Sequence, residues 1–376
     1  MSAPSLDEAW LRSRVWPRFS RVLQRREIYL ANHSLGRPPD RTAYDVRAAL
    51  DAWYRDMAGA WDLWMQGREG FRSLTARLVN APTPDCIVPK TSAGQGLRAV
   101  LNALPGKPRV LATDAEFDSL DFILRVYRDR GRIELKIVPF DRFEYEPCDL
   151  VVASSVAFRT GKILPEVEKL IAHAHSQGAK VLLDVYHHAG VLPLDLGALD
   201  ADFAVGGSYK YLRGGPGACW LYVHPRHHAL VTLDTGWFAK KDVFSYARPE
   251  PPQFAPGGDA WLESTPPVLA PFQALAGLEI TLEVGVERIR EYNLAQKAFL
   301  RSLLPVSGED ASYGAFVTLK HDNATGIAEE LEKQGVKTDA RGEYLRICPD
   351  YLNAREELAR AAATLGSLLR PERTGA

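Results

Sequence analysis

The sequence predicts an α/β fold in which a mostly parallel sheet is covered by helices and followed by a smaller α+β domain. Two observations support this prediction. Apolar runs rich in β-branched residues alternate with amphipathic helical patterns, and a proline-rich stretch after residue 249 separates them from a shorter region with its own strand and helix patterns. Strands that alternate with helices are typical of parallel sheets, because parallel neighbours need a long crossover connection.

Short apolar runs mark the strands that we expect in the large domain. A helical pattern over 165–177 ends at Gly178, a residue type that commonly ends helices because it tolerates positive φ. Elements of this kind, in this order, form repeated strand–helix–strand units. The expected strands are 85–89, 108–112, 133–138, 149–153, 180–184 and 203–206.

The region after residue 249 has a different pattern. Clustered prolines and glycines between 249 and 267 exclude a regular element there. A long helical pattern over 271–302 follows, and strand patterns at 315–319 and 344–348 flank a helical pattern at 324–334. The domains we expect are an N-terminal segment (1–45) that packs with the small domain, a large domain (46–270) and a small α+β domain (271–376).

The composition is that of an ordinary soluble protein. Of 376 residues, 46% are hydrophobic and 25% charged, with a formal net charge of -1, which argues against a nucleic-acid or membrane-surface partner. No stretch has the length and apolar character of a membrane span or a signal peptide. The four cysteines are widely spaced and form no CxxC pair, so neither a zinc site nor a disulfide framework is indicated. We expect a cytoplasmic location.

Two neighbouring segments carry the residues that indicate chemistry. The run KVLLD ends on Asp184, and GGSYKYLRGGPG places Lys210 between two tyrosines after the next expected strand. Ligands of α/β enzymes bind at the carboxyl ends of parallel strands. Asp184 alone is most simply a turn or capping residue, and a lone lysine is equally unspecific. The two in this order, on neighbouring strands, favour a shared site.

Pyridoxal phosphate is the cofactor whose needs these residue types meet. It requires a lysine for a Schiff base and an acid opposite the pyridine nitrogen, together with a flat partner and phosphate donors at a helix N-terminus. The loop 91–96 precedes a helical pattern and can present backbone N–H groups to a phosphate, and Phe117 can stack on the ring. Histidines at 173, 175, 187, 188, 227 and 228 lack an acid or cysteine at ligand spacing, so we expect no metal site.

Five motifs resemble those of kynureninase, in the class V aminotransferase branch of fold type I pyridoxal phosphate enzymes. YLANHSLG is similar to YLxGNSLG, with His33 in place of Asn, and SVAFRTG is similar to SxVxYRTG. DVYHHAG followed by PLDL is similar to DLAHxxGxxPLDL. SYKYL with GGPG resembles the lysine motif, and residues 236–238 match a GWF element. The resemblance covers most of the chain.

The resemblance implies a role for each matching residue. Lys210 carries the Schiff base, Asp184 pairs with the pyridine nitrogen and His187 supports that face of the cofactor. Phe117 stacks on the ring, Ser154 lies near it, and Trp237 and Thr265 approach from a second subunit, which implies a homodimer. The phosphate is held by Tyr209 and by Ser92 or Ala93, and Arg346 binds the substrate α-carboxylate, with an ordinary edge-strand surface arginine as the alternative.

Two departures from the family pattern bear on the substrate. Leu120 stands where the family commonly has an acid or Asn, so that contact is lost or moves to Asp118 or Asp121. Lys240 stands where vertebrate relatives carry a histidine that meets the substrate ring. The physiological substrate and the pathway therefore stay open.

The resemblance favours a hydrolase that cleaves the β,γ C–C bond of kynurenine or a related aryl-keto amino acid to an aryl acid and alanine. A class V aminotransferase or a C–S lyase would use the same lysine, acid and phosphate loop. A cysteine desulfurase needs a mobile cysteine, whereas Cys348 lies in an expected strand. A noncatalytic ligand-binding or scaffold protein on this fold is the remaining alternative, which retention of Lys210 opposes.

Overall fold

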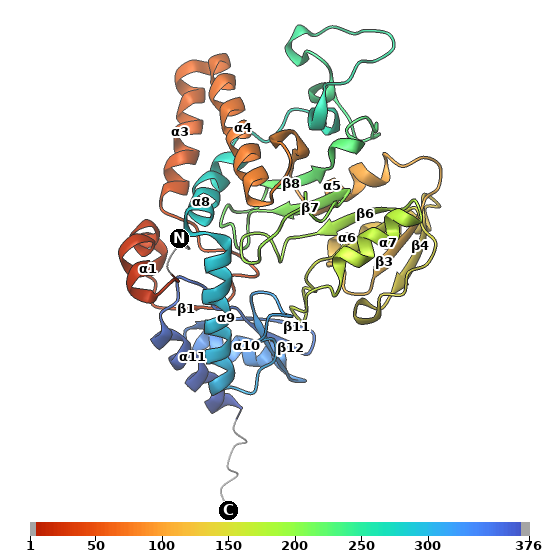
Figure 1. Ribbon diagram of the computed structural model, residues 1–376. Coiled ribbons are helices and arrows are strands. Elements are labelled where there is room, and N and C mark those ends of the chain that lie inside the picture. Colours follow the sequence, from red (N-terminus) through yellow and green to blue (C-terminus); the bar gives the residue numbers. More distant parts are fainter. Residues whose placement is uncertain (1–4, 370–376) are drawn as a thin grey trace, which may run out of the picture.

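A seven-stranded sheet forms the centre of the large domain in the computed structural model, which describes residues 5–369 (Figure 1). Its strands lie in the order β2–β8–β7–β6–β5–β3–β4. β8 runs antiparallel to the other six strands, which are parallel to one another, so the prediction of a mostly parallel sheet is confirmed. The strands are β2 (Ile87–Lys90), β3 (Arg109–Thr113), β4 (Glu134–Val138), β5 (Leu150–Ser154), β6 (Lys180–Asp184), β7 (Phe203–Gly207) and β8 (Cys219–Val223).

Within this sheet, the strand that the sequence did not predict is β8. The six expected strands are present with ends that differ by one or two residues at most, but Cys219–Val223 was not predicted as a strand. It pairs antiparallel with β7, so the chain reverses through a short connection instead of a crossover helix. Lys210 lies in that connection, next to the sheet rather than at the start of a helix.

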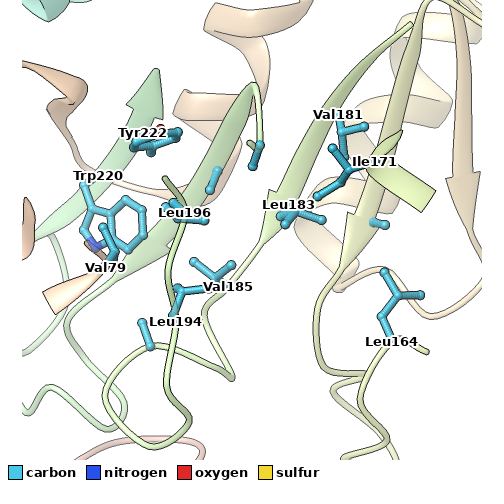
Figure 2. Packing of buried hydrophobic residues seen from close by; sticks show 14 of the residues in the cluster. Val79, Leu164, Ile171, Val181, Leu183, Val185, Leu194, Leu196, Trp220 and Tyr222 are labelled. Atoms are coloured by element: carbon cyan, nitrogen blue, oxygen red, sulfur yellow. The ribbon is translucent and has the colours of Figure 1, made fainter. Parts of the chain in front are cut away.

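Different helices cover the two faces of the sheet. Along β6, Val181 and Leu183 pack on one face and Leu182 on the other, as alternation along a strand requires. Figure 2 shows the first cluster, with Ile171 beside Val181 and with Trp220 further along the sheet. This face is covered by α4 (Ala60–Leu78), α7 (Val167–Ser176) and α8 (Ala270–Val284), and the other by α5 (Ala93–Leu101) and α6 (Asp118–Asp129).

Two glycines end helices as their positive φ allows. Gly178, with φ 77°, follows the end of α7, where the sequence predicted it. The single long helical pattern expected over 271–302 is wrong in one respect, because Gly285, with φ 89°, divides it into α8 and α9 (Val286–Leu303). α8 packs against α4 and α3 (Arg41–Asp56), whereas α9 packs against α11 (Arg355–Leu368).

The smaller C-terminal domain lies below the large sheet in Figure 1. Its antiparallel sheet has the order β11 (Asp339–Arg341), β12 (Tyr344–Ile347) and β9 (Val317–Lys320), with α10 (Ala324–Lys333) and α11 packed against it. The N-terminal strand β1 (Ile28–Tyr29) pairs with β10 (Val336–Lys337) beside α1 (Glu8–Arg14) and α2 (Ser20–Leu23). The domain boundaries at 45 and 270 stay predictions. None of the described helices combines the length and apolar character of a membrane span.

Candidate active site

A cavity of about 140 Å³ opens at the carboxyl ends of β5 and β6, where the sequence predicted a ligand site. The β7–β8 connection and the N-terminus of α5 also contribute residues to the wall of this cavity. The cavity therefore collects segments that are far apart in the sequence. Its lining consists of Thr91, Ser92, Ala93, Phe117, Ser119, Ser154, Val156, Phe158, Asp184, Tyr186, His187, Tyr209, Lys210, Pro216, Gly217 and Cys219.

Lys210 projects into this cavity from the β7–β8 connection. Its side chain is buried, and Nζ lies 2.6 Å from His187 Nε2. Burial lowers the pKa of Lys210 to about 7, a shift that the charge of Asp184 opposes and that of Arg346 favours. A substantial share of neutral amine is therefore present near neutral pH, and the neutral amine is the form that attacks a carbonyl carbon.

Asp184 is the last residue of β6 and faces the same cavity. Its Oδ1 accepts a hydrogen bond from the backbone N–H of Tyr186 at 2.9 Å. Burial raises the pKa of Asp184, while that hydrogen bond and the Lys210 charge lower it. The structure thus brings the predicted lysine and acid together in one enclosed space.

Three aromatic rings surround the amine of Lys210. Nζ lies 5.4 Å from the ring centroid of Phe117, 5.7 Å from that of Tyr186 and 5.5 Å from that of Tyr209. Phe158 meets Phe117 edge-on, with centroids 5.4 Å apart, and so fixes the plane of its ring. Flat walls of this kind suit a planar heteroaromatic ring.

The N-terminus of α5 supplies the position for a phosphate. Ser92 is the N-cap residue, since its Oγ accepts the Gln95 backbone N–H at 3.1 Å, and Ala93 is the first helical residue. Free backbone N–H groups and the helix dipole favour an anion at this end of a helix. Amine, acid, flat walls and phosphate position together fit pyridoxal phosphate.

Glu116 is a buried acid that the sequence analysis missed. Its Oε1 accepts hydrogen bonds from Thr113 Oγ1 at 2.6 Å and from the Ser154 backbone N–H at 2.9 Å, and its Oε2 accepts one from Ser154 Oγ at 2.8 Å. Glu116 therefore ties the end of β3 to the end of β5 and orients Ser154 beside the cavity. Burial raises the pKa of Glu116 to about 7.

At the position of Leu120 two outcomes were expected: the phosphate-side contact is lost, or it moves to Asp118 or Asp121. Leu120 is fully buried in the core, as its sequence context allows. Neither Asp118 nor Asp121 lines the cavity, and Asp121 instead accepts a hydrogen bond from Arg125. The polar side chain that reaches the cavity from this segment is Ser119.

The raised pKa of Glu116 predicts a pH-dependent contribution to stability. An unfolded glutamate loses its proton near 4.5, whereas Glu116 in the folded protein keeps it up to about 7. Between these values the native state binds more protons than the unfolded state, so this contribution to stability falls as the pH rises. We expect Glu116→Gln to remove that part of the pH dependence from the urea-unfolding midpoints of the cofactor-free protein. Asp118→Asn, at an exposed acid nearby, is the control, and equal pH slopes for Glu116→Gln and wild type would contradict the prediction.

Arg346 lies in β12, the central strand of its sheet, and is buried. The alternative interpretation, an ordinary surface arginine in an edge strand, is therefore wrong. Its Nε and Nη2 donate to the Asp339 carboxylate at 2.8 and 2.6 Å, and its Nη1 donates to the carbonyl of Phe158. Asp339 also lies 2.7 Å from His33 Nε2. Arg346 is not part of the cavity lining. Because its guanidinium already binds Asp339, a substrate carboxylate would share the guanidinium with that residue.

Trp237 and Thr265 lie outside the lining of the cavity that contains Lys210. Trp237 Nε1 donates a hydrogen bond to Thr265 Oγ1 at 3.0 Å, at a part of the surface where Thr265 is exposed. The two residues thus stand together, and their contribution to a second subunit's site stays a prediction. Lys240, nearby, donates to the carbonyl of Ala247.

The histidines considered for a metal take part in other contacts. His175 Nε2 and His227 Nε2 lie 2.8 and 2.6 Å from the carboxylate of Asp202. His188 Nε2 lies 2.9 Å from the carbonyl oxygen of Pro193. Within residues 5–369, no group of three or more histidines, cysteines or acids is arranged to hold a metal ion.

The sequence similarity to known proteins extends over most of this chain. The family model described as "Aminotransferase class-V" matches residues 54–327. A kynureninase of Deinococcus radiodurans is 30% identical over 91% of this chain and 90% of its own length. A kynureninase of Bacillus anthracis is 28% identical over 92% of this chain and 89% of its own length.

Solved structures share the fold at lower sequence identity. C-DES, a cystine C–S lyase, in a mutant form with glycine covalently linked to its PLP cofactor, has a TM-score of 0.83 at 21% identity and covers 93% of this chain and 98% of its own. The cysteine desulfurase CsdA from Escherichia coli has a TM-score of 0.80 at 16% identity, with 97% and 99% coverage. These structures share the architecture of the large and small domains.

Proposed function

Since the chain belongs to the class V aminotransferase family, we propose that it is a kynureninase-like hydrolase that cleaves the β,γ C–C bond of an aryl-keto amino acid. Water enters the reaction, and the products are an aryl acid and alanine. The observation that carries the proposal is the similarity to kynureninases over about nine-tenths of the chain.

Pyridoxal phosphate is the cofactor of this protein. When bound, it supplies an electron sink for a carbanion at the substrate Cα. We assign Lys210 to the Schiff base, Asp184 to the pyridine nitrogen and the N-terminus of α5 to the phosphate. The lowered pKa of Lys210 supports this assignment, because the site needs an amine that is partly neutral.

The side chains of this site divide the proton transfers between them. Lys210 Nζ is placed to remove the proton at Cα and to return a proton to the product. His187 Nε2 lies within hydrogen-bond distance of that amine and keeps a lowered pKa because it is buried, so it stays neutral beside it. Tyr209 adjoins Lys210 and is the candidate for a proton relay to the leaving aryl-acyl group.

A cysteine desulfurase reaction is disfavoured by the positions of the cysteines. Such an enzyme needs a mobile, reactive cysteine, and all four cysteines of this chain are buried. Cys348 directly follows β12, and burial raises the pKa of its thiol. Cys219 lines the cavity, but it belongs to β8 and its pKa is also raised by burial.

The proposed function is tested by product analysis of the cofactor-loaded protein. Kynurenine, 3-hydroxykynurenine, cystine and the common amino acids are supplied in turn, and aryl acid, alanine, pyruvate, sulfide and keto acids are quantified. We expect anthranilate and alanine in equal amounts from kynurenine. Pyruvate with a sulfur product from cystine would assign a C–S lyase, and a keto acid formed only with an amino acceptor would assign an aminotransferase. Bound cofactor with no product from any substrate would favour a noncatalytic protein.

Arg346→Lys is expected to keep the cofactor bound and to lose most activity on amino acids. A guanidinium can form two parallel hydrogen bonds with a carboxylate, whereas an ammonium group cannot. The expected loss is roughly 2 to 5 kcal/mol in transition-state binding, measured as a fall in kcat/KM. Equal kcat/KM for variant and wild type would show that the substrate carboxylate is held elsewhere.

The control for this variant is Arg341→Lys. Arg341 also contacts Asp339, at 3.4 Å, but it is largely exposed. An equal loss of activity in both variants would trace the effect to the lost guanidinium contacts with Asp339 instead of to a carboxylate bound by Arg346. Visible absorbance of the bound cofactor, recorded for both, separates substrate binding from cofactor loss.

The positions of Trp237 and Thr265 lead us to expect a homodimer with two shared sites. Both residues lie outside their own chain's cavity lining, and the family resemblance implies that they complete the site of a neighbouring copy. Sedimentation analysis with parallel activity measurements at decreasing protein concentration tests this expectation. Full activity of a monomer would refute it.

A further inference from the structure

Tyr186 lines the cavity, although the DLAHxxG pattern that this segment resembles has alanine at its position. Tyr186 follows Asp184, the last residue of β6, by two residues, and both side chains line the same cavity. The chain therefore places a large aromatic ring next to the acid expected to face the pyridine nitrogen. Neither the proton transfers nor the phosphate position described above uses this ring.

The hydroxyl end of the Tyr186 ring is held by two contacts. Its hydroxyl donates a hydrogen bond to Cys219 Sγ at 2.8 Å, and that thiol donates to the carbonyl of Thr91 at 3.3 Å, beside the phosphate position. Gly207 makes room for the ring, because a Cβ there would lie 2.4 Å from ring atoms of Tyr186. Any residue other than glycine at 207 would displace this ring.

Phe117 and Tyr186 both lie near the amine of Lys210. Nζ lies 5.4 Å from the Phe117 centroid and 5.7 Å from the Tyr186 centroid, and the two rings come from the N-cap of α6 and from the turn that follows β6. A planar group attached to Nζ is thus bordered by an aromatic ring from each of these elements. Aromatic surfaces favour such contacts both through apolar burial and through their quadrupoles.

We propose that Tyr186 forms a second aromatic wall of the pyridoxal phosphate site, opposite Phe117, and that Cys219 fixes its orientation. Tyr186 is then a cofactor-binding residue of this chain in addition to the residues assigned from the motifs. The inference rests on the assignment of Lys210 as the attachment point and is independent of the reaction that the enzyme catalyses.

The test measures cofactor binding without turnover. Cofactor-free wild type, Tyr186→Phe and Tyr186→Leu are titrated with pyridoxal phosphate, and the Kd and the visible circular dichroism of the bound cofactor are recorded. Phenylalanine keeps the ring but loses the hydroxyl bound to Cys219, so its Kd should lie between those of wild type and Tyr186→Leu. Leucine keeps apolar volume but removes the flat face, and its Kd should rise by about tenfold, with a weaker dichroic band. Both variants lose the hydroxyl that binds Cys219, and only Tyr186→Phe keeps an aromatic ring beside that thiol.

Tyr145→Leu is the matched control. Tyr145 is another tyrosine beside a buried cysteine, with Cys148 Sγ 3.7 Å from its hydroxyl, and it lies outside the cavity lining. Its loss should leave the Kd and the dichroic band unchanged. A wild-type Kd and band for Tyr186→Leu would overturn the proposal, and tighter binding would show that Tyr186 occupies space the cofactor needs.

Borohydride reduction and peptide mapping of the same samples test the premise, attachment of the cofactor to Lys210, separately from the role of Tyr186. Trapping on Lys210 in wild type and in both Tyr186 variants leaves the aromatic-wall test valid. Trapping on another lysine in wild type would reject the attachment point, and with it the place of the proposed wall. The product analysis described above has no influence on either readout.

Discussion

Lys210→Ala is expected to abolish covalent attachment of the cofactor and to lower turnover by roughly 10²- to 10⁴-fold, the range that a positioned acid–base group contributes. The variant loses both the amine that binds the cofactor and the group that moves the proton at Cα. The fold should persist, since the neighbouring strands β7 and β8 pair along their whole length without this side chain.

The measurement is borohydride trapping followed by peptide mapping, with a second lysine of the same chain as internal control. Burial also lowers the pKa of Lys297 to about 7, but its Nζ donates to the carbonyls of Gly308 and Gly314 in the small domain. Reduction of wild type should label Lys210 and leave Lys297 unlabelled. Label on Lys297 would mean that a lowered pKa, and not position in the cavity, decides attachment.

Asp184→Asn is expected to retain the cofactor and to lose several orders of magnitude in turnover. A carboxylate opposite the pyridine nitrogen keeps that nitrogen protonated, and a neutral amide does not. The amide keeps the shape of the side chain and can still accept the hydrogen bond from the Tyr186 backbone N–H. The loss should therefore appear in kcat and in the visible spectrum more than in cofactor affinity.

Asp184→Glu is the companion variant, because it keeps the charge but moves it by one methylene group. It should recover a part of the turnover that asparagine loses. Near-normal rates for Asp184→Asn would remove the assignment of this residue to the pyridine nitrogen, whatever glutamate does. Circular dichroism in the far ultraviolet serves to establish that both variants fold.

Local patterns were sufficient for the strands that bear the site. β6 was predicted with its observed ends, and its last residue, Asp184, faces the cavity as strand geometry requires. β8 was missed because its five apolar residues follow a glycine-rich turn without a crossover helix, so no alternation of strand and helix marks it. The break between α8 and α9 was missed because Gly285 stands in an otherwise continuous helical pattern.

The site was harder to predict wherever burial or a distant partner decides a residue's state. Four acids lie at 114, 116, 118 and 121, and nothing in their local sequence distinguishes the one that is buried. Glu116 is selected by its contact with Ser154, a residue of another strand. The sequence indicates the role of Glu116 only weakly, because the contact with Ser154 can be foreseen only if β3 and β5 are known to be neighbours in the sheet.

The sequence by itself determined the alternation of strands and helices as far as β7, the α/β class and the residues that could carry pyridoxal phosphate chemistry, since periodicity, turn residues and strand ends are local properties. Only the tertiary structure decided that Arg346 is paired with Asp339, that Tyr186 reaches Cys219, and that Lys210 has a lowered pKa. The reason is physical: desolvation and ion pairing depend on which distant segments surround a side chain, and strand pairing, not local pattern, brings those segments together.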